Sequence, residues 1–488
     1  MTSVKLRWAF AIAVVTATLV FACSGQEERS DPGSPTAAAT KTARPTPKLT
    51  SKPTPAATPA PTSAPTPPPP PPSPAPVASQ AAEQGTTSAP PALPGTGPNY
   101  YVDDVNGNDG NSGMSEAAAW FSLNKASTIT LRPGERLLFK RGGVWAGTLK
   151  IEESGAGGMP VVIASYGSGP LPIIQGGNDC IALFGSGIIV MQIQAQGCWA
   201  GVRIASGASF DRVEGSVVTG NVAGVHISSG ASDNILIGNT VQGNNKMSKL
   251  TPSPSNDDSG AFGILLNGDR NEVLHNLISG SDAFSYDYGR DGAAVEVYGG
   301  QGNNIRHNVA VDNQAFSELG DSRSRDNTFA YNLVLSSLPD STFLVTRGSE
   351  DGFGPVANTR LFNNTVVMTG AGSQGFVCHA GCNSSILTMR NNIVQAALKA
   401  GYADGDFDED YNIYAGGITQ FPLGPHSAVG NPMFNNPGGG DFHLARGSPA
   451  VDSGVDAGYT ADLEGRYVPH DGNADGIAVA DRGAFESN

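Results

Sequence analysis

The feature that most constrains the fold is a segment that returns almost unchanged after 23 residues. The sequence GVRIASGAS at 201–209 recurs as GVHISSGAS at 224–232, and related apolar segments follow at 263–268 and 294–299. A period of roughly 22–24 residues is typical of solenoids, in which each turn adds one unit of strands and turns that packs on its neighbours. The repeat therefore predicts an elongated stack of short strands.

Asparagine marks a second periodic signal within short apolar strands, as in LHNLI at 274–278. Asparagine tolerates the left-handed turn between strands, and stacked copies can pass amide hydrogen bonds from coil to coil. The strands are β-branched and separated by glycine, and no long helical period competes with them. We therefore expect an all-β, single-stranded parallel β-helix. The asparagines are Asn239, Asn276, Asn308, Asn332, Asn364 and Asn392, four of them preceded five residues earlier by Asn234, Asn271, Asn303 and Asn327.

The N-terminus has the pattern of an export signal. Lys5 and Arg7 precede an apolar run that is too short for a comfortable membrane span. The run ends in Val-Phe-Ala-Cys, which resembles a bacterial lipobox and predicts a lipoprotein signal peptide over 1–23 with Cys23 as the lipidated residue. The alternative is ordinary cleavage, which would give a freely secreted protein rather than one anchored to the outside of the cell membrane.

Residues 24–98 have the composition of a tether. Of the 35 prolines in the chain, 21 lie between residues 29 and 98, mostly among Ala, Thr and Ser and without an aromatic residue. Such a segment cannot bury a core, so we expect a disordered, extended, polyproline-like linker. The domain prediction is therefore a signal peptide over 1–23, a linker over 24–98 and a β-helix over 99–488.

Charge narrows the choice of partners. The chain has 29 Lys and Arg against 44 Asp and Glu, a formal net charge of −15. Nucleic acid is excluded, because phosphate binding needs clustered basic residues. A strongly anionic polymer is disfavoured unless calcium intervenes, whereas neutral glycans are compatible with an acidic surface.

Segments at both ends of the predicted domain resemble one superfamily. YYVD at 100–103, NGNDG at 106–110, LRPGERLLFKRGG at 131–143, GSPAVDSG at 447–454 and DRGAFE at 481–486 are similar to pectate-lyase-like right-handed parallel β-helix proteins. The resemblance implies an N-terminal cap region over 99–178 and a closing segment over 430–488. It also implies a polysaccharide or cell-surface glycan as partner. It does not choose an activity, because the superfamily contains lyases, hydrolases, epimerases and binding proteins.

Four cysteines remain after Cys23. Cys180 and Cys198 are 18 residues apart, close to one coil, and Cys378 and Cys382 would close a small local loop. Two disulfides, Cys180–Cys198 and Cys378–Cys382, fit an exported protein. A zinc site built from Cys378, His379 and Cys382 is the alternative, although it lacks a fourth ligand.

The coil over 290–320 has the richest set of polar groups. Glu296 alternates outward between Val295 and Val297, and Glu318 follows one coil later, after 22 residues. Two carboxylates on neighbouring rungs about 5 Å apart would match the pair of a retaining glycosidase. In the alternative reading they flank a calcium ion or an arginine, and a shift of one residue would turn Glu318 inward. The predicted catalytic residues are Glu296, Glu318, Asp291, Asp312 and Arg306.

Two irregular insertions, over 245–262 and 281–290, interrupt the repeat beside this coil. Insertions on one side of a solenoid usually form its binding face, and their Tyr and Asp residues suit sugars. The plainer alternative is that these acidic loops only face solvent. Histidines 275 and 307 are expected to be stacked outward rungs rather than catalysts. The predicted substrate-binding residues are Tyr298, Asp287, Tyr288, Asp258, Arg347 and His226.

Two oxygen-rich turns are candidate calcium sites. Asp471, Asn473 and Asp475 follow the first positions of an EF-type loop, but the position of the final glutamate is Arg482. Either turn can instead be a simple Asx turn. The other turn contains Asp104, Asn106 and Asn108.

Together these features predict a monomeric surface protein that acts on carbohydrate. The motifs of polygalacturonases, epimerases and arginine-dependent pectate lyases are absent from the sequence. A glycoside hydrolase or a polysaccharide lyase is the first hypothesis. A non-catalytic protein that binds glycans or neighbouring cells is the second.

Overall fold

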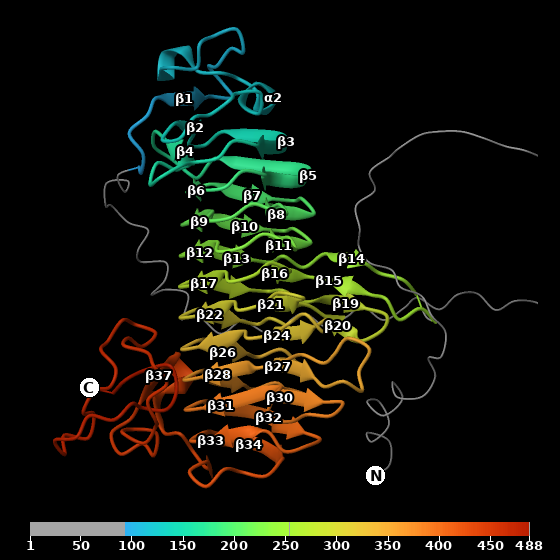
Figure 1. Cartoon of the computed structure of the whole chain (residues 1–488), viewed down its shortest axis with the longest axis vertical. Coiled ribbons are helices and arrows are strands. Elements are labelled where there is room, and N and C mark those ends of the chain that lie inside the picture. The colour runs from blue at the N-terminus through green and yellow to red at the C-terminus, as the bar shows by residue number, and fades with distance from the viewer. Residues whose placement is uncertain (1–92, 253, 488) are drawn as a thin grey trace, which may run out of the picture. The chain divides into compact units, whose positions relative to one another are not determined.

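The structure, a computed structural model, describes residues 93–487 except residue 253. They form a right-handed parallel β-helix, whose coils Figure 1 shows stacked from β1 in blue to β34 in orange. The predicted fold class is confirmed. The predicted signal peptide with Cys23, and the linker up to residue 92, lie outside the described residues. Within the described part, no helix has the length and apolar character needed to cross a membrane.

Three ladders of parallel strands form the wall of the stack. The second ladder is a 12-stranded sheet. The first and third ladders belong to one 19-stranded sheet, because the long strands β5 and β32 pair with strands of both.

The first ladder contains β3 (Val144–Ile151), β5 (Ile173–Leu183), β8 (Ala200–Ile204), β11 (Ala223–Ile227), β16 (Phe262–Leu266), β21 (Ala293–Tyr298), β24 (Ala315–Gly320), β27 (Thr342–Arg347), β30 (Gln374–His379), β32 (Ile393–Ala403) and β34 (Ile413–Gln420). The second contains β1 (Asn99–Val102), β2 (Arg136–Lys140), β4 (Val161–Tyr166), β6 (Ile188–Met191), β9 (Arg212–Glu214), β12 (Ile235–Ile237), β17 (Glu272–Leu274), β22 (Asn304–Arg306), β25 (Thr328–Ala330), β28 (Thr359–Phe362), β31 (Leu387–Arg390) and β33 (Asp408–Asp410). The third adds β7 (Gln194–Gln196), β10 (Val217–Thr219), β13 (Thr240–Gln242), β18 (Leu277–Ser279), β23 (Val309–Val311), β26 (Leu333–Ser336), β29 (Thr365–Met368) and β35 (Ala428–Val429).

Apolar columns fill the inside of the stack. Val202, Val225, Ile264 and Val295 are register partners on successive strands of the first ladder, and each is at most 1% exposed. Residues between them point outward, as the two-residue period of a strand requires. The core is therefore a continuous pile of matching rungs, and the outward positions form columns on the surface.

The two ends of the stack are closed differently. At the N-terminal end, η2 (Glu116–Ala118) and α2 (Leu123–Ala126) cover the first coil with the buried Trp120 and Leu123. Residues 93–98, which fall in the predicted linker, lie against β2, where Arg136 Nε donates to the Pro94 carbonyl at 2.9 Å. At the C-terminal end, Phe407 and Phe421 pack against the core.

The closing segment does not cover the last coil but runs along the outside of the stack, in red in Figure 1. It contains β36 (Phe434–Asn436), η3 (Pro437–Gly439) and β37 (Asp441–Leu444). Phe485 packs with Leu333 and Val367 of the third ladder, and Val468 packs with Tyr331 beside the second. The segment therefore shields a corner of the solenoid over several coils.

Buried asparagines hold the coils in register. The backbone N–H and the side-chain Nδ2 of Asn234 both donate to Asn271 Oδ1, at 3.0 and 2.9 Å, and Asn271 repeats this pattern toward Asn303. A second ladder runs from Asn239 through Asn276 to Asn412. The expected amide transfer between coils is confirmed.

The expected left-handed position is one residue away from the asparagines. The residue before the ladder asparagine carries the positive φ, as in His275 (53°), His307 (55°) and Tyr331 (52°). The rings of His275 and His307 stack with centroids 5.1 Å apart, so these histidines are outward rungs, as predicted. His307 Nε2 also lies 3.2 Å from the carbonyl oxygen of Ala461, which ties the closing segment to the stack.

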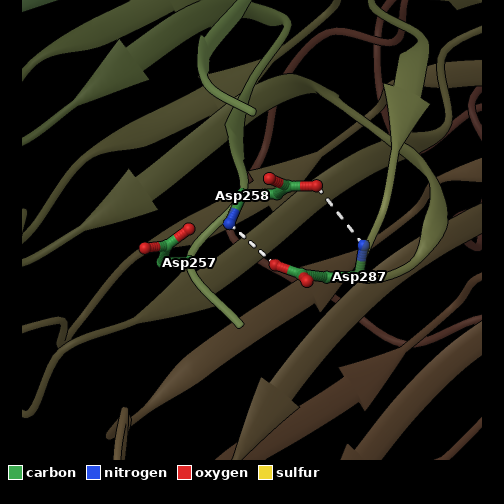
Figure 2. A group of neighbouring side chains, drawn as sticks. All are labelled: Asp257, Asp258 and Asp287. Atoms are coloured by element: carbon green, nitrogen blue, oxygen red, sulfur yellow. Dashed lines mark hydrogen bonds between the residues drawn. The ribbon is translucent and has the colours of Figure 1, made fainter. Parts of the chain in front are cut away.

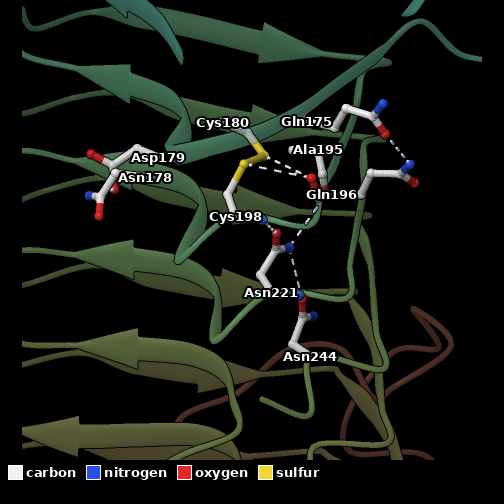
Figure 3. The surroundings of a disulfide bond; sticks show 9 residues. All are labelled: Gln175, Asn178, Asp179, Cys180, Ala195, Gln196, Cys198, Asn221 and Asn244. Atoms are coloured by element: carbon white, nitrogen blue, oxygen red, sulfur yellow. Dashed lines mark hydrogen bonds between the residues drawn. A yellow bond between two sulfur atoms is a disulfide. The ribbon is translucent and has the colours of Figure 1, made fainter. Parts of the chain in front are cut away.

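Both predicted disulfides are present. The Cys180–Cys198 bond joins neighbouring coils with the Cα atoms 5.7 Å apart, and Figure 3 shows it at the head of a third amide ladder in which Cys198 N donates to Asn221 Oδ1 at 2.8 Å. Cys378 is bonded to Cys382. The zinc alternative for Cys378, His379 and Cys382 is wrong, because a disulfide has no thiolate to offer a metal.

The two insertions form antiparallel hairpins between the third and first ladders. The first hairpin joins β14 (Met247–Lys249) to β15 (Ser259–Gly260), and the second joins β19 (Ala283–Ser285) to β20 (Gly289–Asp291). Figure 1 shows both projecting from the same side of the stack. They therefore stand beside β16 and β21, the strands that directly follow them.

One buried carboxylate occupies an asparagine position. Asp211 Oδ1 accepts from Ile188 N at 2.8 Å, and Asp211 N donates to Asn234 Oδ1 at 2.9 Å, as ladder asparagines do. In a ladder asparagine the second side-chain atom is Nδ2, which donates a hydrogen bond. In Asp211 this atom is Oδ2, and it is buried without a hydrogen-bond partner. Burial raises the pKa of Asp211 to about 7, so the acid is neutral below that pH.

We expect Asp211→Asn to stabilise the protein above pH 7 by about 1–3 kcal/mol, because the amide supplies the missing donor. A raised folded pKa means that this part of the stability is lost as the pH rises from the unfolded value near 4 through about 7. The gain should therefore shrink toward pH 4 in thermal or guanidinium unfolding. Asp233→Asn, which removes the exposed partner of Arg270, is the control and should give no gain. Equal stability of Asp211→Asn and the natural chain at pH 8 would contradict the assignment.

Candidate active site

Two glutamates meet on the outer surface of the first ladder. Glu296 on β21 and Glu318 on β24 are register partners, so their side chains leave neighbouring rungs at a spacing of about 4.8 Å. Both are partly exposed. The predicted register therefore holds, and Glu318 does not turn inward. We call Glu296 and Glu318 the acid pair.

A buried arginine holds one member of the pair. Arg347, at the end of β27, is only 7% exposed, and its Nη2 donates to Glu318 Oε1 in an ion pair. The ring of Phe353 covers the guanidinium at 5.9 Å from its centre. The arginine therefore holds the Glu318 side chain in place, and the other Glu318 oxygen is not involved in this ion pair.

Gly320 makes room for the groups around this ion pair. A β-carbon at Gly320 would lie 3.1 Å from Tyr298 Cδ2 and 3.7 Å from Arg347 Nη1. Tyr298 lies one rung before Gly320 and Arg347 one rung after it. Because glycine has no side chain, the Tyr298 ring and the Arg347 guanidinium both lie close to this position. Tyr298, Phe353 and Tyr288 are 42%, 51% and 56% exposed, so aromatic rings border the acid pair on the open surface.

The site favours a protonated Glu296. Burial, the charge of Glu318 and the charge of Asp291 raise the pKa of Glu296 well above its usual range, and Arg347 offsets only part of this effect. Burial and Glu318 likewise raise the pKa of Asp291 to about 7. One rung therefore presents an acid whose pKa is raised, and the next presents a carboxyl group bound to an arginine. This is the division of roles that acid catalysis requires.

The two hairpins are joined through Asp258 (Figure 2). Asp258 N donates to Asp287 Oδ2 at 2.8 Å, and Asp258 Oδ2 accepts from Tyr286 N at 2.7 Å and from Ser285 Oγ at 2.9 Å. Its Oδ1 accepts from Thr251 N at 2.6 Å. Asp258 was expected to bind sugar, but its carboxylate is buried and satisfied by the chain itself. Asp258 therefore joins the two hairpins by hydrogen bonds and so holds Tyr288 and Asp291 beside the acid pair.

A cation can be considered at the same place. Ligand atoms of Asp257, Asp258 and Asp287 lie within 4.8 Å of one another. The donors around Asp258 compete with a metal, and Asp257 already pairs with Lys249 at 2.5 Å. The contacts of these three residues are those of a hydrogen-bonded junction between the two hairpins.

Both turns expected to bind calcium are Asx turns. Asp471 and Asn473 accept from the backbone N–H groups of Asp475 and Gly476, and Asp475 accepts from Ile477 N. Asn108 accepts from Gly110 N, and Asp104 accepts from Val144 N. Asn106 donates to Asp103. Calcium binding at either turn stays a prediction.

Arg306 and Asp312 do not join the acid pair. Arg306 lies on β22 of the second ladder and pairs with Glu272 at 2.7 Å. Asp312 accepts from Ser337 N at 2.7 Å and fixes the following turn. The expectation that they belong to the catalytic cluster is corrected by the strand order, because the chain leaves the first ladder after β21 and returns to it only at β24.

His226 lies two rungs from Glu296 in the same outward column, through Leu265. Gly320 and Phe353 were not among the site residues predicted from the sequence. A glycine two residues after Glu318 and an aromatic residue in the turn after Arg347 were visible signals, but only the fold shows that both meet the same guanidinium.

We expect Asp258→Ala to release both hairpins. The buried carboxylate accepts four hydrogen bonds, the fourth from Asp287 N at 3.3 Å. Their loss should raise amide exchange over 247–260 and 283–291 at least tenfold, about 1.4 kcal/mol of local stability, while the coils stay protected. Asp257→Ala is the matched control, since it removes only a partly exposed pair with Lys249. Similar exchange in the two variants would show that the Asp258 carboxylate does not hold the two hairpins together.

Comparison with known proteins supports the fold. No family model matches the sequence, and no curated protein does. Among solved structures, pectate lyase Pel9A aligns with a TM-score of 0.53 and 15% identity, over 80% of this chain and 96% of that chain. An alginate lyase from Paenibacillus sp. str. FPU-7 aligns with a TM-score of 0.44 and 16% identity, over 60% and 97% of the two chains. A tailspike protein of E. coli bacteriophage HK620 gives 0.42 and 11%, over 64% and 57%. At these identities the chain shares a parallel β-helix fold with Pel9A, and its chemistry must be argued from its own residues.

Proposed function

We propose that this protein hydrolyses glycosidic bonds of a neutral polysaccharide with retention of configuration. Glu296 is the acid/base and Glu318 the nucleophile. The observation that carries the proposal is the position of Glu296 and the arginine-bound Glu318 on adjacent rungs of the first ladder. Retaining glycosidases hold their two carboxyl groups about 5–5.5 Å apart, close to the rung spacing of about 4.8 Å.

The proposed reaction gives each member of the acid pair one role. Glu296 gives its proton to the glycosidic oxygen, and the leaving sugar departs as an alcohol. Glu318 forms a bond from its carboxylate oxygen to the anomeric carbon. Glu296, now ionised, takes a proton from a water molecule, whose oxygen displaces Glu318 and restores both groups. Arg347 keeps the attacking carboxylate oriented throughout.

Charge supports hydrolysis of a neutral chain over elimination from an acidic one. A lyase needs a base and a positive environment for the uronate group. On this surface Arg203, Arg290 and Arg347 are each held by a carboxylate, from Asp179, Asp282 and Glu318. The acids around Glu296 would repel a uronate, whereas the exposed aromatic rings suit the apolar faces of neutral sugars.

Glycan binding without cleavage is the second candidate. The exposed rings of Tyr288, Tyr298 and Phe353 favour it, because they would bind a sugar whether or not the acid pair reacts. Incubation with xylan, β-mannan, β-1,3-glucan and galactan separates the candidates. New reducing ends indicate hydrolysis, ultraviolet-absorbing unsaturated ends indicate a lyase, and retained polymer without products indicates binding alone.

We also propose that the protein is exported and carried on the cell surface as a monomer, with the lipid anchor at Cys23. The support is the signal pattern of residues 1–23 and the two disulfides, which persist in oxidising compartments. In that position the β-helix would meet glycans outside the cell at the end of the proline-rich linker.

Glu318→Gln and Glu296→Gln should each lower kcat by about 10²–10⁴-fold on the polymer that the panel identifies, with little change in fold. Azide should restore turnover of an activated aryl glycoside in Glu296→Gln, because it replaces the base-activated water. Glu214→Gln is the control, since Glu214 lies on β9 of the second ladder. Full activity in either acid-pair variant would contradict the proposed mechanism.

Asp291→Asn should move the basic limb of the kcat/KM–pH profile to lower pH. The charge of Asp291 is one of the causes that raise the pKa of Glu296, so its removal lets Glu296 lose its proton at lower pH. Activity should therefore decline earlier as the pH rises, while the acidic limb changes less. Asp282→Asn is the comparison. A basic limb that stays in place would show that Asp291 does not act on the acid.

A further inference from the structure

The first ladder carries a second set of polar and aromatic side chains toward its N-terminal end. Arg203 on β8 and His226 on β11 occupy the outward column that continues through Leu265 to Glu296. Phe184, which follows β5, and Asn267, which follows β16, occupy the neighbouring column that contains Tyr298. The distance from the rung of Phe184 to that of Glu296 is four steps, about 19 Å. This is long enough for several sugar units.

Phe184 and Arg203 lie together at the far end of this stretch, and we call these two side chains the platform. Phe184 is 42% exposed, and the Arg203 guanidinium lies 5.1 Å from its ring centre. Arg203 Nε donates to Asp179 Oδ2 at 2.6 Å, so the platform carries no net charge. A partly exposed aromatic ring beside neutralised hydrogen-bonding groups is suited to the ring and hydroxyls of a neutral sugar.

The middle of this stretch is organised around His226. Asn267 Nδ2 donates to the Tyr298 carbonyl at 2.8 Å, so its Oδ1 must accept from His226 Nε2, which lies 2.8 Å away. The ring proton is therefore on Nε2, and Nδ1 is a buried acceptor without a partner. The Trp199 ring packs edge-on against His226 and donates from Nε1 to Ser248 Oγ of the first hairpin at 3.2 Å.

We propose that Phe184, Trp199, Arg203, His226 and Asn267 form the N-terminal subsites of this protein. They bind further units of the same neutral polysaccharide whose bond lies at the acid pair. The inference rests on the proposed function for the site of cleavage. Binding on the platform holds a long chain along the face, so bonds inside the polymer are cut in preference to those of short fragments.

Binding to a chain that cannot complete hydrolysis tests the subsites. The full chain with Glu318→Gln is run in native gels containing xylan, β-mannan, β-1,3-glucan or galactan, and Phe184→Ala or Trp199→Ala is added to it. Each addition should weaken retardation by the bound polymer about tenfold. Tyr467→Ala, an equally simple loss of an exposed ring on the closing segment, should leave retardation unchanged. Phe184 is exposed, so its variant tests binding even if Trp199→Ala fails to fold.

The outcomes separate the two proposals. Retardation within twofold of the Glu318→Gln parent in both variants overturns the subsites, as does the absence of retardation by all four polymers. If the variants lose binding but the natural chain makes no products, the subsites stand and the hydrolysis fails. If products form, Phe184→Ala should lower kcat/KM for the polymer at least fivefold more than for a disaccharide glycoside.

Discussion

The buried amide ladders are the constraint on which the rest of the structure depends. Each ladder asparagine satisfies its neighbour's backbone and side chain at once, so a coil displaced by one residue would leave several buried polar groups unpaired. The same displacement would exchange the inward and outward faces of every strand. The position of Glu296 opposite Glu318 is thus a consequence of contacts on other walls of the coil, between residues that never touch the site.

This register places several acidic side chains close together, and neighbouring groups offset their mutual repulsion. Two glutamates on adjacent rungs, with Asp291 nearby, cannot all be ionised without strong repulsion. Arg347 forms an ion pair with Glu318, while burial and the two neighbouring acids raise the pKa of Glu296. Because Arg347 comes from the next coil and is covered by Phe353, its charge is directed at the pair with little solvent screening. The two acids therefore differ because Glu296 is desolvated by burial and Glu318 is bound by Arg347.

The hairpins and the second disulfide support this surface from opposite ends. Asp258 joins the hairpins so that Tyr288 and Asp291 stand beside β21. On the other side, Cys378–Cys382 closes the loop that contains His379, the register partner of Arg347. The irregular segments are therefore fixed to the regular stack at both borders of the acid pair, which is the arrangement expected where loops carry function on a rigid scaffold.

The sequence by itself determined the parallel β-helix, the asparagine ladders and the neighbouring rungs of Glu296 and Glu318, and it favoured both disulfides over a zinc site. All of these follow from periodicity and spacing, since in a solenoid the number of residues between two positions indicates how many coils separate them. The sequence could not assign Arg306 and Asp312 correctly, because closeness along the chain does not show where a coil turns its corner. Nor could it show that Asp258 is buried between two hairpins, or that Gly320 lets Tyr298 and Arg347 meet. Those facts depend on how insertions fold back on the stack and on which side chains share a rung, and only the tertiary structure decides them.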